Sequence, residues 1–147
     1  MFKQIRILSI ALLAALLLTA GCSNLAQEDF DMNIAITVTV GDTSFAATLL
    51  DVPASLQLLN RLPLTIDMQE LNGNEKYYYF DEGFAADSER VGSIQSGDLM
   101  LYGSDCLVLF YDSFSTPYSY TRLGSIDDPT GLAEALGRGN VTVSFEK

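Results

Sequence analysis

Apolar and polar residues alternate with a period of two along several short stretches of the chain, the pattern of strands that bury one face. The first stretch covers residues 34–40 and is rich in β-branched side chains, which favour strands. Gly41 and Asp42 then form a turn signal. Residues 43–50 predict the returning strand of a hairpin, with Phe45, Ala47 and Leu49 on one face.

Six further stretches predict strands by the same pattern or by apolar content. They are residues 64–71, 75–80, 99–102, 106–111, 118–126 and 140–146. The stretch 75–80 is rich in aromatic residues and predicts a strand at a sheet edge. The run 106–111 is apolar at both odd and even positions, which indicates a strand that is buried on both faces. Residues 81–95 have no period and predict a long exposed loop, and residues 113–117 predict a shorter one.

Two short helices interrupt the strand pattern. Residues 53–61 carry leucines at helical spacing, with Asp51 as the expected N-cap and Pro53 in the first turn. The second helix is expected to start at Asp128 and Pro129 and to stop at Gly137.

These elements amount to about eight strands and two helices in residues 33–147, which predicts one mainly β domain. Many short strands favour a β-barrel, because closure removes unpaired edges. Three segments resemble the bacterial cyclophilin-like domain family: residues 71–77 (LNGNEKY), 97–103 (GDLMLYG) and 114–124 (FSTPYSYTRLG). Together with the N-terminus described below, they predict a cyclophilin-like fold lipoprotein. The resemblance implies a closed eight-stranded cyclophilin-like β-barrel with two short α-helices.

The N-terminus predicts export. Residues 1–21 have two cations followed by an apolar segment of signal-peptide length. The sequence LTAGC that ends at Cys22 resembles a bacterial lipoprotein cleavage site, which implies lipidation of Cys22 and a tether over residues 22–32. We therefore expect a lipid-anchored protein of the cell envelope, in either membrane leaflet, whose membrane contact is the N-terminal lipid. The alternative is a buried cysteine in a signal-anchor helix.

Charge and composition exclude several functions. Without residues 1–21 the chain keeps 6 Lys+Arg and 19 Asp+Glu, a net charge of 6 − 19 = −13, which argues against nucleic acid as a partner. The chain has no His, so a Ser-His-Asp triad and a His-ligated zinc site are impossible. Cys106 opens an apolar run and is expected in the core. We expect no metal and no cofactor.

One segment concentrates groups that could contact a ligand. Tyr102, Phe114, Tyr118 and Tyr120 could form an aromatic wall, and Arg122 could bind a carboxylate or a carbonyl. In the opposite interpretation the rings fill the core or the barrel ends, and Arg122 pairs with Asp127 or Asp128.

Three functions follow, with no catalytic residue assigned. The first is binding of a small ligand or a peptide segment. The second is a divergent peptidyl-prolyl cis-trans isomerase or chaperone, in which Arg122 would polarise the prolyl bond. The third is an accessory lipoprotein with no binding site.

Overall fold

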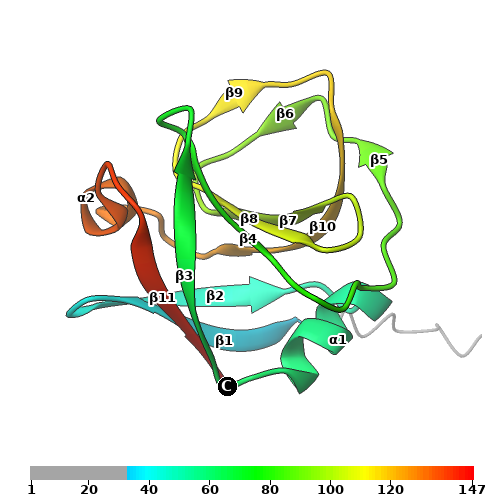
Figure 1. Cartoon of the computed structure of the whole chain (residues 1–147), viewed down its shortest axis with the longest axis horizontal. Coiled ribbons are helices and arrows are strands. Elements are labelled where there is room, and N and C mark those ends of the chain that lie inside the picture. The colour runs from blue at the N-terminus through cyan, green and yellow to red at the C-terminus, as the bar shows by residue number, and fades with distance from the viewer. Residues whose placement is uncertain (1–32) are drawn as a thin grey trace, which may run out of the picture.

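Eight antiparallel strands close into a barrel in the computed structural model, which describes residues 33–147 (Figure 1). The barrel strands are β1 (Ile34–Val40), β2 (Thr43–Leu49), β3 (Leu64–Leu71), β4 (Glu75–Tyr79), β7 (Asp98–Tyr102), β8 (Cys106–Phe110), β10 (Ser119–Ile126) and β11 (Val141–Glu146). Around the barrel the order is β2-β1-β11-β3-β4-β8-β7-β10, and β10 pairs with β2 to complete the circle. The expected eight-stranded barrel with two short helices is confirmed.

The predicted signal peptide, Cys22 and the tether lie outside the described residues. Within residues 33–147, neither helix is long and apolar enough to cross a bilayer.

Closure of the barrel depends on one close approach between β10 and β2. Gly124 lies opposite Leu49, and the register of β10 against β7 shifts between Arg122 and Gly124. A Cβ atom on Gly124 would lie 2.1 Å from the carbonyl oxygen of Thr48. Only glycine therefore lets the two backbones meet at this point.

The interior of the barrel holds the main core, and alternation decides which side chains enter it. Phe45, Ala47 and Leu49 of β2 all point inward, as their period predicts. On β8, Leu107 and Leu109 enter the same core. Burial of this apolar surface is the main source of stability for a domain of this size.

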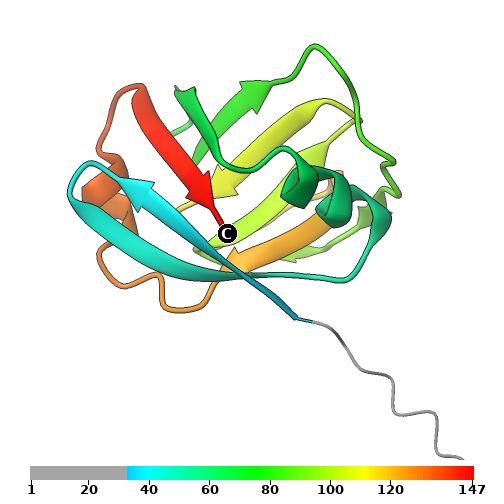
Figure 2. The same cartoon turned by 90° about the horizontal axis from the view of Figure 1, so that it is seen from below.

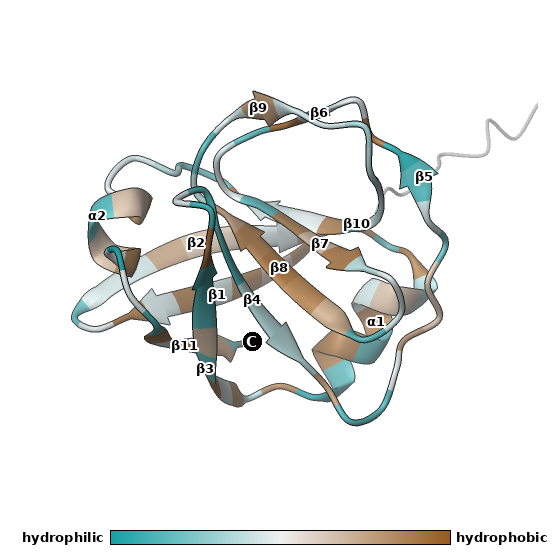
Figure 3. Ribbon diagram, turned by 45° about the horizontal axis from the view of Figure 1, so that its top comes forward, coloured by the Kyte–Doolittle hydropathy of each residue, from teal (hydrophilic) through white to brown (hydrophobic). Residues whose placement is uncertain are grey.

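A second apolar cluster lies on the outer face of the barrel. The short strands β6 (Ser93–Ile94) and β9 (Phe114–Ser115) pair with each other and lie over β7, β8 and β10 (Figure 1). The cluster consists of Ile94, Met100, Cys106, Val108, Phe110 and Tyr120. This outer layer explains why β8 is apolar along its length (Figure 3) and confirms its predicted burial on both faces. The expected core position of Cys106 is also confirmed.

The two helices lie at opposite ends of the barrel (Figures 1 and 2). Helix α1 (Pro53–Asn60) begins at the expected proline, but its N-cap is Val52, with no side-chain hydrogen bond, so the predicted Asp51 cap is wrong. Helix α2 (Leu132–Leu136) begins later than expected because Gly131, its N-cap, is left-handed at φ 82°. Gly137 ends α2 as predicted.

Two predicted loops contain short strands, and one strand predicted at the edge of the sheet lies inside it. Within 81–95, β5 (Glu89–Arg90) pairs with β10 and β6 pairs with β9, which itself lies in the predicted loop 113–117. Strands of two residues have no measurable period, so local sequence could not reveal them. Strand β4 lies between β3 and β8 and is therefore not an edge.

Candidate functional site

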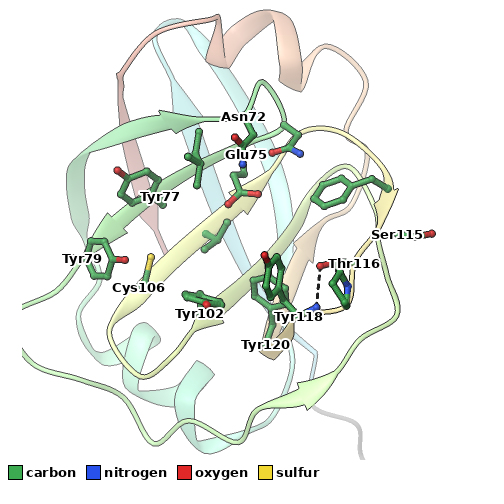
Figure 4. A pocket seen from close by; sticks show the side chains of 15 residues that line it. Asn72, Glu75, Tyr77, Tyr79, Tyr102, Cys106, Ser115, Thr116, Tyr118 and Tyr120 are labelled. Atoms are coloured by element: carbon green, nitrogen blue, oxygen red, sulfur yellow. Dashed lines mark hydrogen bonds between the residues drawn. The ribbon is translucent and has the colours of Figure 1, made fainter.

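A groove of about 450 Å³ opens on the outer face of the barrel, beside the second apolar cluster (Figure 4). Strands β4, β7, β8 and β10 contribute to its lining, and the segment 114–118 forms another wall. The lining is mainly aromatic and polar: Leu71, Asn72, Asn74, Glu75, Tyr77, Tyr79, Tyr102, Cys106, Val108, Phe114, Ser115, Thr116, Pro117, Tyr118 and Tyr120.

Strand alternation places the side chains of β4 in two different environments. Tyr77 and Tyr79 lie on the groove side, with ring centroids 5.7 Å apart. Tyr78 packs against the interior core, and the Lys76 side chain is completely buried. The dense aromatic run at 77–79 therefore serves both the groove and the core.

Rings from β7, β8, β9 and β10, together with Tyr118 just before β10, form a continuous aromatic row. Tyr102 lies 6.3 Å from Tyr118 and 5.6 Å from Tyr120, centroid to centroid. Phe110 continues the row toward Phe114 at 5.8 Å and contacts Tyr120 at 5.6 Å. Three of these pairs are edge-to-face and the Tyr102–Tyr120 pair is tilted. Aromatic pairs at these distances attract each other, which holds the row in a defined geometry.

Hydrogen bonds hold the wall 114–118 in place. The Thr116 N–H donates to the carbonyl oxygen of Gly92 at 3.0 Å, next to the β6–β9 pairing. The Tyr118 N–H donates to Oγ1 of Thr116 at 3.2 Å, which closes a tight turn around Pro117. Backbone pairing and turn chemistry thus present Tyr118 at the rim.

Two acceptor groups that receive no hydrogen bond from the described residues lie at one end of the groove. Oδ1 of Asn74 is buried and has no hydrogen-bond partner within residues 33–147. Glu75, the next residue, is partly buried and forms no ion pair in the same part of the chain. Burial and the nearby charge of Glu70 raise the pKa of the Glu75 carboxyl above its ordinary value.

Cys106 lines the groove but is not poised for nucleophilic chemistry. Burial raises the pKa of its thiol to about 11, although the Tyr79 side chain opposes this shift. The thiol is therefore protonated at neutral pH, and no His exists in the chain to activate it.

The structure separates Arg122 from the aromatic residues with which it was grouped. Its guanidinium lies 3.9 Å from carboxylate oxygens of both Asp98 and Glu89, and it donates to the carbonyl oxygen of Val91 at 3.4 Å. The expected pairing of Arg122 with Asp127 or Asp128 is wrong, since β7 and β5 supply its acidic neighbours.

Arg122 lines a second cavity of about 410 Å³, near the start of α1. No Lys or Arg of residues 33–147 lines the aromatic groove. An isomerase site that uses Arg122 beside the aromatic rings gains no support from this placement. That alternative stays a prediction.

Four of the five candidate residues do lie together. Tyr102, Phe114, Tyr118 and Tyr120 all line the groove, although Tyr120 is only 5% exposed and belongs to the second apolar cluster. Sequence reasoning missed the opposite side of the groove, formed by Asn74, Glu75, Tyr77 and Tyr79. The spacing of residues 75, 77 and 79 does predict that they lie together, because side chains two residues apart share one face of a strand.

A family model described as the cyclophilin-like family matches residues 38–146. No curated protein matches the chain.

Proposed function

The chain belongs to the cyclophilin-like family, and we propose that its aromatic groove binds a small ligand or a peptide segment at the cell envelope. The observation that carries this proposal is the exposure of aromatic rings around one concave site. Tyr79, Tyr102 and Tyr118 are 58%, 47% and 59% exposed, and all three line the groove. Clustered exposed apolar side chains that border a polar rim are typical of binding sites.

The rings around the groove also provide a direct signal of binding. Five of the seven tyrosines of the chain line the groove, and the chain has no Trp. Tyrosine fluorescence therefore reports mainly on this site. Tyr118 is the best residue to change, because it is exposed at the rim, whereas Tyr120 is packed into the second apolar cluster.

We expect saturable binding of at least one member of a panel of blocked tripeptides, Ac-Ala-Xaa-Ala-NH₂, with each standard residue at the centre. Tyr118→Ala should weaken that binding up to about tenfold, because an aromatic contact contributes about 0.5–1.5 kcal/mol. The protein is made from its full sequence, extracted in non-ionic detergent and titrated by tyrosine fluorescence.

Leu56→Ala is the control, since Leu56 is 40% exposed on α1 and does not line the groove. It should leave the affinity unchanged. Both variants should unfold within about 0.5 kcal/mol of the parent protein, as is usual for exposed positions. The proposal fails if no tripeptide binds, or if Tyr118→Ala binds as tightly as the parent.

We also propose that a lipid on Cys22 anchors this domain to a membrane. Support comes from the LTAGC sequence, which follows an apolar segment at the position of a lipoprotein cleavage site. Lipidation of an exported chain would hold the domain at the membrane through residues 22–32.

Cys22→Ala should abolish incorporation of a labelled fatty acid and release the protein into the soluble fraction. Cys106→Ala, which removes the other cysteine, should keep both the label and the membrane association. Label that persists in Cys22→Ala would contradict lipidation at this residue.

A further inference from the structure

We propose that the groove selects ligands that carry a primary ammonium or guanidinium group, which Asn74 and Glu75 bind at one end beside the tyrosine rings. This inference rests on the proposed binding function and names the chemical class of its ligand. The group could belong to a free amine or to a Lys or Arg side chain of a peptide.

The first observation is a pair of acceptor groups that receive no donor from the described part of the chain. Within residues 33–147, Oδ1 of Asn74 is buried without a hydrogen bond, which is costly for a polar atom. The carboxylate of Glu75 lies among the lining side chains and does not point away from them (Figure 4). An N–H donor from a ligand would satisfy Asn74, and a positive charge would compensate Glu75.

The second observation is that no Lys or Arg of the described residues 33–147 lines this groove. Lys76 is adjacent in sequence, but alternation directs it to the other side of β4. There its ammonium binds the Glu70 carboxylate and the carbonyl oxygens of Gly137 and Gly139, at 2.8 and 2.6 Å. Arg122 lines the other cavity. The position of a counter-ion for Glu75 is therefore open to a ligand.

The third observation is the set of rings beside this carboxylate. Tyr77 and Phe114 line the groove together with Glu75, and Tyr79, Tyr102 and Tyr118 extend the aromatic surface. Aromatic faces attract cations within about 6 Å of the ring centroid. An anionic ligand would instead face an uncompensated carboxylate, and the net charge of the chain, −11, would also repel it.

Protonation of Glu75 should control binding. Its raised pKa means that the charged form is disfavoured in the empty groove, and a bound cation would favour it. The groups that interact with Glu75 are Glu70, Cys106, Tyr111 and Tyr120. Glu70 has a lowered pKa and pairs with Lys76, while Cys106 and Tyr111 titrate near 11 and 12. Of these groups, Glu75 is therefore the one carboxyl with a raised pKa, because the raised pKa values of Cys106, Tyr111 and Tyr120 lie in the alkaline range.

The experiment compares matched probes against the detergent-extracted protein made from its full sequence. Pentylammonium is paired with n-pentanol, and Ac-Ala-Lys-Ala-NH₂ with Ac-Ala-Gln-Ala-NH₂. Each cation should bind about 10- to 100-fold more tightly than its neutral partner, the range expected for hydrogen bonds to a charged group. The cation affinity should fall as the pH drops through the raised pKa of Glu75. Tetramethylammonium, which lacks N–H donors, should bind more weakly than pentylammonium.

Glu75→Gln should remove the preference for cations and its pH dependence without lowering the melting temperature, because it removes a charge whose burial is unfavourable. Glu82→Gln, the same charge change at an exposed residue outside the groove, should leave the preference intact. If the lysine tripeptide binds more tightly than pentylammonium, the ligand is a peptide; equal affinities indicate a free amine.

Two outcomes separate this inference from the proposed function. If neutral and cationic probes bind equally and Tyr118→Ala weakens both, the groove binds ligands but the preference for cations is wrong. If no probe binds, both proposals fail. Equal affinity for tetramethylammonium and pentylammonium would overturn the role of the N–H donors, and an unchanged preference in Glu75→Gln would overturn the role of the carboxylate.

Discussion

Gly124→Ala is expected to destabilise the domain by about 3 kcal/mol or more, at or beyond the upper end of the usual range for overpacking. The added methyl carbon would lie 2.1 Å from the carbonyl oxygen of Thr48 and 2.8 Å from Cα of Leu49. Both neighbours are backbone atoms of β2, so neither can move away without opening the β10–β2 pairing that closes the barrel. Urea unfolding followed by far-UV circular dichroism measures this loss.

Gly139→Ala is the matched control for that substitution. A Cβ atom on Gly139 would meet nothing within 4 Å, and its backbone is not left-handed. The free energy of unfolding should therefore change by less than about 0.5 kcal/mol. A loss below about 1 kcal/mol in Gly124→Ala would show that the barrel can close without this close approach.

Lys76→Met is expected to cost about 3 kcal/mol of stability, the lower end of the range for breaking a buried ion pair. The Lys76 side chain is 0% exposed, and its ammonium donates to the Glu70 carboxylate and to the carbonyl oxygens of Gly137 and Gly139. Methionine is also unbranched, although one heavy atom shorter, and it removes the donor that Glu70, Gly137 and Gly139 share. Glu70 then keeps hydrogen bonds from the Tyr111 hydroxyl and the Gly73 N–H but loses its cation. Thermal and urea unfolding both measure the change.

The same variant should alter the pH dependence of stability. Burial raises the pKa of Glu70, but hydrogen bonds from Lys76, Tyr111 and the Gly73 N–H outweigh it, and the pKa is lowered from its ordinary 4.5. A carboxyl whose pKa is lower in the folded state stabilises the fold at pH values above its ordinary pKa. This stabilisation is lost as the pH falls through the pKa of the folded state. Lys76→Met should reduce this acid dependence below about pH 4.5.

Two comparisons test whether the effect belongs to the buried pair. Arg138→Met removes an exposed cation between Gly137 and Gly139, the two residues whose carbonyl oxygens accept from Lys76. It should change the free energy of unfolding by less than about 0.5 kcal/mol. The double variant Lys76→Met, Glu70→Gln should be more stable than Lys76→Met alone, because it no longer contains an unpaired carboxylate. A Lys76→Met protein as stable as Arg138→Met would refute this role of Lys76.

Much of the fold is determined by local sequence. Period-two alternation predicted the hairpin at residues 34–50 and the strand 64–71, and proline and glycine marked the start of α1 and the end of α2. Residues 106–111 were predicted to be buried on both faces because both parities are apolar. These features are predictable since strand faces, helix starts and turns depend on residues close together in the chain.

The site was only partly predictable. Proximity in sequence places four aromatic residues in one candidate site, and all four line one groove: Tyr102, Phe114, Tyr118 and Tyr120. The same proximity predicts that Arg122 joins them, yet Arg122 lines a different cavity. Proximity in sequence therefore identified the aromatic row but could not show which cavity each residue faces.

The sequence by itself thus determined the barrel strands, the inward faces of the strands and the aromatic character of the region. Only the tertiary structure decided that β6 and β9 lie over the outer face of β8, and that Asn74 and Glu75 line the same groove as the aromatic rings. The physical reason is that alternation tells which residues share a face, but not which distant strand lies beside them. That neighbour is selected by closure of the barrel, to which long-range pairs such as Gly124 with Leu49 contribute.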